Sequence, residues 1–139
     1  MKIVIDTNCL VRILPKNSPY RYLWDAFRQG KYRLCYSTEI LKEYEEILLR
    51  FNFPESVMLI MEMLTAATNG IATVPYFKWN LITADPDDNK FVDCAISANA
   101  DYIVTNDKHF NILKMTDFPK INVINIEQFI KIITLPHRP

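Results

Sequence analysis

The chain has 139 residues, half of them apolar, and its 16 basic and 16 acidic side chains balance to a net charge of zero. That length suits one ordinary domain, and the apolar content suffices to bury a core, so a disordered tail is excluded. A zero net charge argues against a protein that binds bulk nucleic acid by overall attraction.

Glycine, histidine and cysteine are scarce, and their positions exclude several kinds of site. Gly30 and Gly70 are the only glycines, and neither has the spaced partners of a dinucleotide-binding or phosphate-binding loop. Cys9, Cys35 and Cys94 form no C-x-x-C pair, which argues against structural zinc and favours free thiols in a reducing cytoplasm. No apolar stretch approaches the ~18 residues that span a membrane, and no signal peptide is recognisable.

The first quarter of the chain is predicted to form a strand, a helix and a second strand. Residues 2–5 are short, β-branched and uniformly apolar, which is typical of a central strand in a parallel sheet. Ser18 and Pro19 suit the start of a helix that continues to about Arg28. Residues 33–36 are expected to form the next strand.

Two helices are predicted in the middle of the chain. Ser37 suits the N-cap of the first, whose apolar side chains follow helical spacing at Ile40, Leu41, Tyr44, Ile47 and Leu48, with Glu43 at the border of this stripe. The second, rich in Met and Leu, starts at Pro54 and is stopped by Asn69 and Gly70. Its apolar surplus at residues 58–64 permits a homodimer.

The last part of the chain resumes the alternation after an irregular stretch at residues 71–86. A helix is expected from Asp87 or Asp88 to about Ala100. The remaining predicted elements are a strand at residues 102–105, a short helix through Phe110 and Leu113, a strand at 121–124 and a helix at 126–133.

This alternation predicts a three-layer α/β sandwich with a mostly parallel central sheet. We expect residues 1–134 to form a single domain and residues 135–139 to be a frayed tail. In an open parallel sheet the carboxyl ends of all strands share one edge, where ligands bind.

Two acidic residues follow predicted strands and are expected at that edge. Asp6 comes directly after residues 2–5, and Asp107 follows the strand at 102–105 by two residues. If those strands are neighbours, the two carboxylates meet, and acids in the first turns of the following helices can join them. Asp93 fits less simply, because it lies nearly opposite the apolar face of its helix.

Converging carboxylates imply a bound cation. Two carboxylates about 4 Å apart repel by ~4 kcal/mol at an effective dielectric constant near 20, which is large beside an ordinary stability of ~5 to 15 kcal/mol. Oxygen ligands without thiolate or histidine select Mg²⁺ or Mn²⁺. Such an ion can activate water and neutralise the charge that develops on a phosphodiester.

Several motifs together resemble the PIN-domain nucleases. They are Asp6-Thr7-Asn8, Glu43 within residues 37–44, the run D-x-x-I-x-A-x-A from Asp93 to Ala100, and Thr105-Asn106-Asp107. The stretch D-P-D-D-N-K-F at residues 85–91 is typical of small prokaryotic PIN proteins described as toxins of toxin–antitoxin pairs. The resemblance covers essentially the whole chain in order and spacing.

This resemblance implies a Mg²⁺- or Mn²⁺-dependent endoribonuclease that hydrolyses single-stranded RNA in the cytoplasm, with an antitoxin as a possible protein partner. Its catalytic acids would be Asp6, Glu43, Asp93 and Asp107. The metal would be bound by Asp6, Asp93 and Asp107, while Glu43 would orient water or accept a proton. Asn8 and Thr105 would hold the liganding carboxylates in place.

One residue departs from the family pattern. Many relatives carry a second acid two positions after the one that matches Asp107, and here that position is His109. The departure puts a second metal site in doubt, and Asp88 is the additional acid that could compensate.

Two alternatives have other functions. A receiver or phosphatase-like protein also places Asp on a metal at a strand end, but it requires an acid pair beside the first strand, where this chain has Thr7 and Asn8. A catalytically inactive PIN-like module that binds RNA or protein would keep the fold without needing the four acids.

Charge is distributed unevenly along the chain. Residues 1–33 carry a net charge of +5 and residues 85–107 a net charge of −5. One interpretation is that the basic part, including Arg12 and Lys16, guides RNA phosphates toward an acidic centre. The alternative is that these charges only cover solvated faces.

Overall fold

In the computed structural model, which describes residues 1–135, five parallel strands form one sheet in the order β3–β2–β1–β4–β5. The strands are β1 (Lys2–Ile5), β2 (Arg33–Tyr36), β3 (Gly70–Ala72), β4 (Tyr102–Val104) and β5 (Val123–Ile124). Because β1 pairs with β4, Ile5 lies opposite Val104 and the two strands end side by side. The predicted tail at 135–139 lies, apart from Leu135, outside the described residues.

Six α-helices and two 3₁₀ helices connect the strands within residues 1–135. The α-helices are α1 (Thr7–Ile13), α2 (Arg21–Arg28), α3 (Thr38–Phe51), α4 (Pro54–Ala66), α5 (Asn89–Ala98) and α6 (Ile126–Thr134). The 3₁₀ helices are η1 (Pro86–Asp88) and η2 (Lys108–Met115). None of the described helices is long and apolar enough to cross a membrane.

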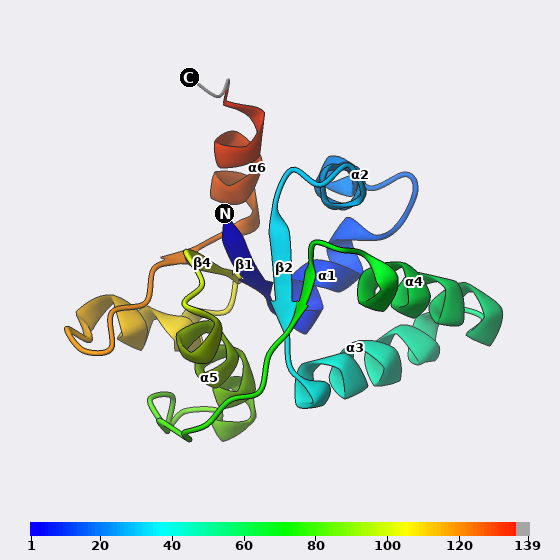
Figure 1. Cartoon of the computed structure of the whole chain (residues 1–139). Coiled ribbons are helices and arrows are strands. Elements are labelled where there is room, and N and C mark those ends of the chain that lie inside the picture. The colour runs from blue at the N-terminus through cyan, green and yellow to red at the C-terminus, as the bar shows by residue number, and fades with distance from the viewer. Residues whose placement is uncertain (136–139) are drawn as a thin grey trace.

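Helices cover the sheet, as the sandwich prediction requires. Helix α5 packs against β1, β2 and β4, and α1 passes behind β2 in the view of Figure 1. Helix α2 contacts both α1 and α6, and α3 contacts α1, α4 and α5. The predicted α/β class with a parallel sheet is confirmed.

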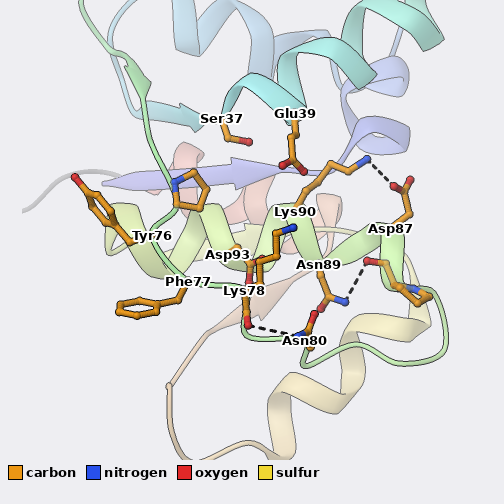
Figure 2. A pocket seen from close by; sticks show the side chains of 12 residues that line it. Ser37, Glu39, Tyr76, Phe77, Lys78, Asn80, Asp87, Asn89, Lys90 and Asp93 are labelled. Carbon is orange, nitrogen blue, oxygen red and sulfur yellow. Dashed lines mark hydrogen bonds and ion pairs between the residues drawn. The ribbon is translucent and has the colours of Figure 1, made fainter.

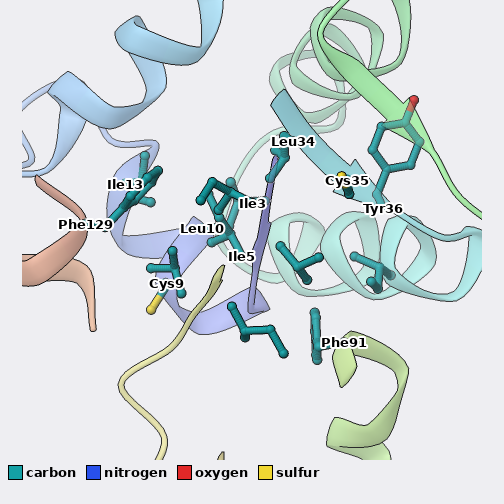
Figure 3. Close-up of a cluster of buried hydrophobic side chains, with 14 of the residues drawn as sticks. Ile3, Ile5, Cys9, Leu10, Ile13, Leu34, Cys35, Tyr36, Phe91 and Phe129 are labelled. Carbon is teal, nitrogen blue, oxygen red and sulfur yellow. The ribbon is translucent and has the colours of Figure 1, made fainter. Parts of the chain in front are cut away.

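The core lies between these layers and explains why the central strands are uniformly apolar. Ile3 and Ile5 of β1 are fully buried with Leu10 of α1 and Leu34 of β2, and Phe129 reaches the same cluster from α6 (Figure 3). Burying one such side chain stabilises the fold by about 1.5 to 3 kcal/mol. The cluster therefore anchors the ends of β1 and α1, which carry the polar residues described below.

The structure shortens the strand predicted at 121–124 to Val123–Ile124, and α5 runs from Asn89 to Ala98 after the separate turn η1. Larger differences from the predicted elements occur at three places. Helix α1 follows β1 without a turn, because the Asp6 side chain caps it by accepting the N–H of Cys9. Helix α2 begins at Arg21, since Ser18 accepts the N–H of Tyr20 and so forms a turn before the helix. The irregular stretch after residue 70 opens with the short strand β3, which pairs with β2.

Candidate functional site

Asp6 lies at the carboxyl end of β1, where its carboxylate joins two elements. One oxygen accepts the backbone N–H of Cys9 at 2.8 Å, and the other accepts the hydroxyl of Thr105 from the end of β4. Asp6 is 6% exposed, and burial raises its pKa although both hydrogen bonds act in the opposite direction. The side chain is thus fixed at the sheet edge and is costly to ionise in isolation.

Asp107 faces Asp6 through the same threonine. The Thr105 hydroxyl accepts the Asp107 N–H at 3.0 Å, and the Asp107 carboxylate caps η2 by accepting the N–H of His109 at 2.9 Å. The charge of Asp107 contributes to the raised pKa of Asp6. Asp6 and Asp107 therefore lie close together at the ends of neighbouring strands, as expected, and Thr105 lies between them.

Asp88 brings a third carboxylate to this edge from the turn of η1. Its Oδ2 is buried and has no hydrogen-bond partner among residues 1–135. Burial, followed by the charges of Asp85, Asp107 and Asp6, raises the pKa of Asp88 to about 6, and His109 acts against this rise. We call Asp6, Asp85, Asp88 and Asp107 the acidic cluster.

The donor set of this cluster fits a divalent cation. Asp85, Asp88 and His109 can each offer a ligand atom within 4.8 Å of the others. The His109 Nδ1 lies 3.4 Å from an oxygen of Asp107 and 3.7 Å from the Oδ2 of Asp88. Carboxylate oxygens suit Mg²⁺ and Mn²⁺, and an imidazole nitrogen is accepted more readily by Mn²⁺ and other transition metals.

Glu43 lies at the border of the cluster and is held from both sides. Its carboxylate accepts the Thr7 hydroxyl, and its Oε1 lies 2.7 Å from the Lys90 Nζ. Lys90 also pairs with Asp87 at 3.0 Å. Burial alone would lower the pKa of Lys90, but its hydrogen bonds to Glu43 and Asp87 raise it. A charged lysine therefore partly balances the acids here.

The other side of the cluster opens on a cavity of about 200 Å³. It is lined by Asp6, Asn8, Cys9, Arg12, Asn106 and Asp107. Asn8 and Arg12 thus line the same cavity as the two strand-end acids, and the Arg12 guanidinium carbon lies over the Tyr20 ring, 5.2 Å from its centroid. This is the part of the site where an anionic group can meet a positive charge.

Asp93, by contrast, lies away from the acidic cluster. It lines a separate cavity of about 340 Å³ with Glu39, Lys78 and other residues (Figure 2), and its Oδ1 accepts the N–H of Trp79 at 3.1 Å. Burial raises its pKa first, and the charges that act on it come from Glu39 and Lys78. The structure therefore brings together Asp6, Asp88 and Asp107 with Glu43 beside them, but does not bring Asp93 to them.

Sequence patterns do not predict a role for three residues of the site, Thr7, Asp85 and Lys90. Asp85 and Lys90 belong to the run D-P-D-D-N-K-F, whose spacing alone does not show that Pro86 starts a separate 3₁₀ turn before α5. Thr7 reads as a turn residue but donates to Glu43. The feature of the sequence that could have pointed to this part of the site is the three acids within residues 85–88.

The fold and cluster together define a class: a parallel α/β protein with carboxylates gathered at the carboxyl edge of its sheet. A sequence profile described as the PIN domain matches residues 2–109. The chain therefore belongs to the PIN-domain family, which confirms the resemblance.

Comparison with solved structures gives the same fold. The chain is similar to VapBC2 from Rickettsia felis, in a crystal structure with a DNA fragment from its promoter, with a TM-score of 0.61. The sequences are 18% identical, and the match covers 90% of this chain and 98% of that chain. No curated protein matches this chain significantly.

Proposed function

We propose that this PIN-domain protein is a Mg²⁺- or Mn²⁺-dependent endoribonuclease that hydrolyses phosphodiester bonds of single-stranded RNA. The observation that carries the proposal is the buried Oδ2 of Asp88, which has no hydrogen-bond partner within residues 1–135 and lies among the charges of Asp6, Asp85 and Asp107. Charges of one sign at such a position are costly without a cation, since two carboxylates about 4 Å apart repel by ~4 kcal/mol at an effective dielectric constant near 20.

The proposed ligands are Asp88 and, beside it, Asp6 and Asp107, whose charges act on Asp88. Asp85 and His109 each offer a further ligand atom within 4.8 Å of that of Asp88. When bound, a divalent ion would supply water of lowered pKa and neutralise charge developing on the phosphate. Thr105 holds Asp6 and orients the Asp107 backbone. This set replaces Asp93, expected from sequence, with Asp88.

Glu43 and Arg12 complete the proposed chemistry. Thr7 and Lys90 fix the Glu43 carboxylate, which we assign to orient the attacking water and accept its proton. Arg12 lines the cavity beside Asp6 and Asp107, where its guanidinium can bind a substrate phosphate. Asn8 lines the same cavity and is assigned to hold Asp6 or a ligand water.

Cleavage of defined single-stranded RNAs by purified protein, with Mn²⁺ and with EDTA, tests this function. We expect cleavage only with the metal, and Asp6→Asn should lose at least ~10²-fold if it removes a metal ligand. Equal cleavage by wild type and Asp6→Asn would identify a contaminating nuclease. Tight RNA binding with no cleavage in any metal would instead support the catalytically inactive module.

We further propose a toxin role with an antitoxin partner in the cytoplasm, because one similar solved structure is that of VapBC2 bound to a DNA fragment from its promoter. An apolar groove of about 370 Å³ between α3 and α4, lined by Leu49, Val57, Met58 and Met61 among others, offers a surface for that partner or a second copy.

A growth assay tests the toxin role. Induced expression of the wild-type protein in a bacterial host should arrest growth, whereas expression of Asp6→Asn should not. Equal growth of both strains would contradict the toxin role.

A further inference from the structure

The cavity around Asp93 has no role in the proposed hydrolysis, and we propose that it binds a guanine base of the RNA. This inference rests on the proposed function and adds a base preference to it. The cavity measures about 340 Å³, within the usual range for pockets that hold small ligands. Its lining combines a buried carboxylate, lysines and two aromatic rings.

The cavity is lined by residues that adjoin the acidic cluster in the chain, so we infer that one RNA strand can reach both. Lys90 lines the cavity and also contacts Glu43 at 2.7 Å. Pro86 and Asp87, which line it too, directly precede Asp88. A base in the cavity would therefore belong to a nucleotide at or next to the phosphate held at the cluster.

Asp93 supplies a hydrogen-bond acceptor directed at the cavity. The residue is 7% exposed, and its Oδ1 accepts the Trp79 N–H. No hydrogen bond from the part of the chain that the structure describes, residues 1–135, reaches its Oδ2, so this oxygen can bind a ligand. Lys78 lies close enough for its charge to oppose the rise in the pKa of Asp93 that burial and Glu39 cause. Figure 2 shows Lys78 and Asp93 side by side at this position. An anionic acceptor and a cationic donor thus stand next to each other.

Guanine matches this pair better than the other bases. Its Watson–Crick edge presents the O6 acceptor, the N1–H donor and the N2 amino donor in a row, so a carboxylate can accept two N–H groups while a lysine donates to O6. Adenine and cytosine present an amino donor next to a ring acceptor, and the N–H of uracil lies between two acceptors. In the same position, adenine, cytosine and uracil would each place the lone pair of a ring nitrogen or a carbonyl oxygen against the carboxylate, which would repel it.

Aromatic side chains at the cavity supply a surface for stacking. Tyr76 and Phe77 line it and are 82% and 69% exposed. Phe77 packs edge-on against Trp79 with 6.1 Å between ring centroids, which holds this segment in place. Bases of single-stranded RNA gain affinity by stacking on such rings. Stacking on these rings would hold any base in the cavity, and the hydrogen bonds to Asp93 would select guanine.

Fluorescence anisotropy in EDTA tests the subsite without cleavage. A short oligouridine with one central guanosine should bind wild type about 10-fold or more tightly than the same oligouridine without it. Replacing the guanosine by inosine, which lacks the N2 amino group, should remove a large part of that difference. The inosine measurement needs no variant and so does not depend on folding.

Asp93→Asn keeps an oxygen for the Trp79 N–H but can turn an amide donor toward the base. We expect it to reduce the guanosine preference below about 2-fold while affinity for oligouridine stays unchanged. Glu62→Gln, an exposed acid on α4, is the control and should keep the preference.

Equal affinity for guanosine, inosine and uridine oligonucleotides, or a preference that Asp93→Asn leaves intact, would overturn the subsite. Metal-dependent cleavage alongside either result would leave the proposed nuclease standing. A guanosine preference lost in Asp93→Asn, in a protein that cleaves no RNA, would support the subsite and refute the nuclease.

Discussion

Lys90 of α5 and Glu43 of α3 form an ion pair at the border of the acidic cluster, with 2.7 Å between Nζ and Oε1. Their side chains are only 12% and 20% exposed, so solvent screens the pair less than an ion pair on the surface. Tyr44, the next residue on α3, donates its hydroxyl to the carbonyl of Ile5 at the end of β1. These contacts fasten α3 and α5 to the sheet edge where the acids gather.

Lys90→Met should therefore destabilise the protein by about 1 to 3 kcal/mol, since it leaves the Glu43 carboxylate without its cation in a half-buried place. Urea unfolding would measure the loss. The matched control is Arg50→Met, which breaks an exposed pair with Glu46 and should cost less than about 1 kcal/mol. An equal loss of unfolding free energy in the two variants would show that the Lys90–Glu43 pair stabilises the fold no more than an exposed ion pair does.

The effect of metal binding on stability can show whether Asp88 or Asp93 is a metal ligand, and it needs no substrate. An ion that binds only the native state at ten times its Kd stabilises it by ~1.4 kcal/mol, which raises Tm by about 2 to 6 °C. We expect Mn²⁺ to produce this shift in wild type and in Asp93→Asn, but not in Asp88→Asn. A shift lost in Asp93→Asn and kept in Asp88→Asn would favour the ligand set expected from sequence.

The difference between those two acids shows where sequence reasoning reached its limit. Asp6 and Asp107 follow strands, so the geometry of a parallel sheet predicts their meeting. Asp88 belongs to the 3₁₀ turn before α5, and a helical pattern cannot give the direction in which such a turn points its side chains. Asp93 does lie within α5, and its position opposite the apolar face, noted from the pattern, agrees with its separate cavity.

The missed elements have similar physical causes. Strand β3 has three residues, begins with Gly70 and is an edge strand that pairs with β2, so no alternation of apolar and polar residues predicts it. Helix α1 starts at once after β1 because Asp6 serves both as the strand-end acid and as the helix cap. Short segments such as these depend on tertiary contacts more than on local sequence.

Stability of the metal-free protein should fall as pH rises from about 4 to 6. The pKa of Asp88 is raised to about 6 in the folded protein, so between these values the native state binds a proton that the unfolded chain releases. The proton bound to Asp88 adds up to about 2 kcal/mol to the free energy of unfolding, and this contribution is lost above pH 6. Urea unfolding in EDTA at a series of pH values would measure it.

Asp88→Asn is the comparison for this pH effect. The variant should equal wild type near pH 4 and be more stable near pH 7, because it no longer places an ionised carboxylate beside Asp85 and Asp107. Parallel pH curves for the two proteins would show that Asp88 titrates as an ordinary surface acid.

Substrate approach should depend on the basic N-terminal part of the chain. Arg12 lines the cavity beside Asp6 and Asp107, and Lys16 is exposed just after α1. Changing both to Glu should weaken RNA binding and reduce the slope of log K against log salt, because fewer counterions are released. Lys131→Glu on α6 is the control, and its slope should match wild type. An unchanged slope in the double variant would show that Arg12 and Lys16 do not contact phosphate.

His109 should influence which ion the protein prefers. Its Nδ1 lies within 3.7 Å of both Asp88 and Asp107, so an ion at this edge would meet an imidazole nitrogen as well as carboxylate oxygens. Because nitrogen ligands favour Mn²⁺ over Mg²⁺, wild type should bind Mn²⁺ more tightly, and His109→Asp should bring the two affinities closer together. Isothermal titration of metal into protein would give both constants without reference to cleavage, and His109→Asn separates loss of the imidazole from gain of a charge. An identical ratio of the two affinities in wild type and both variants would place the ion out of reach of His109.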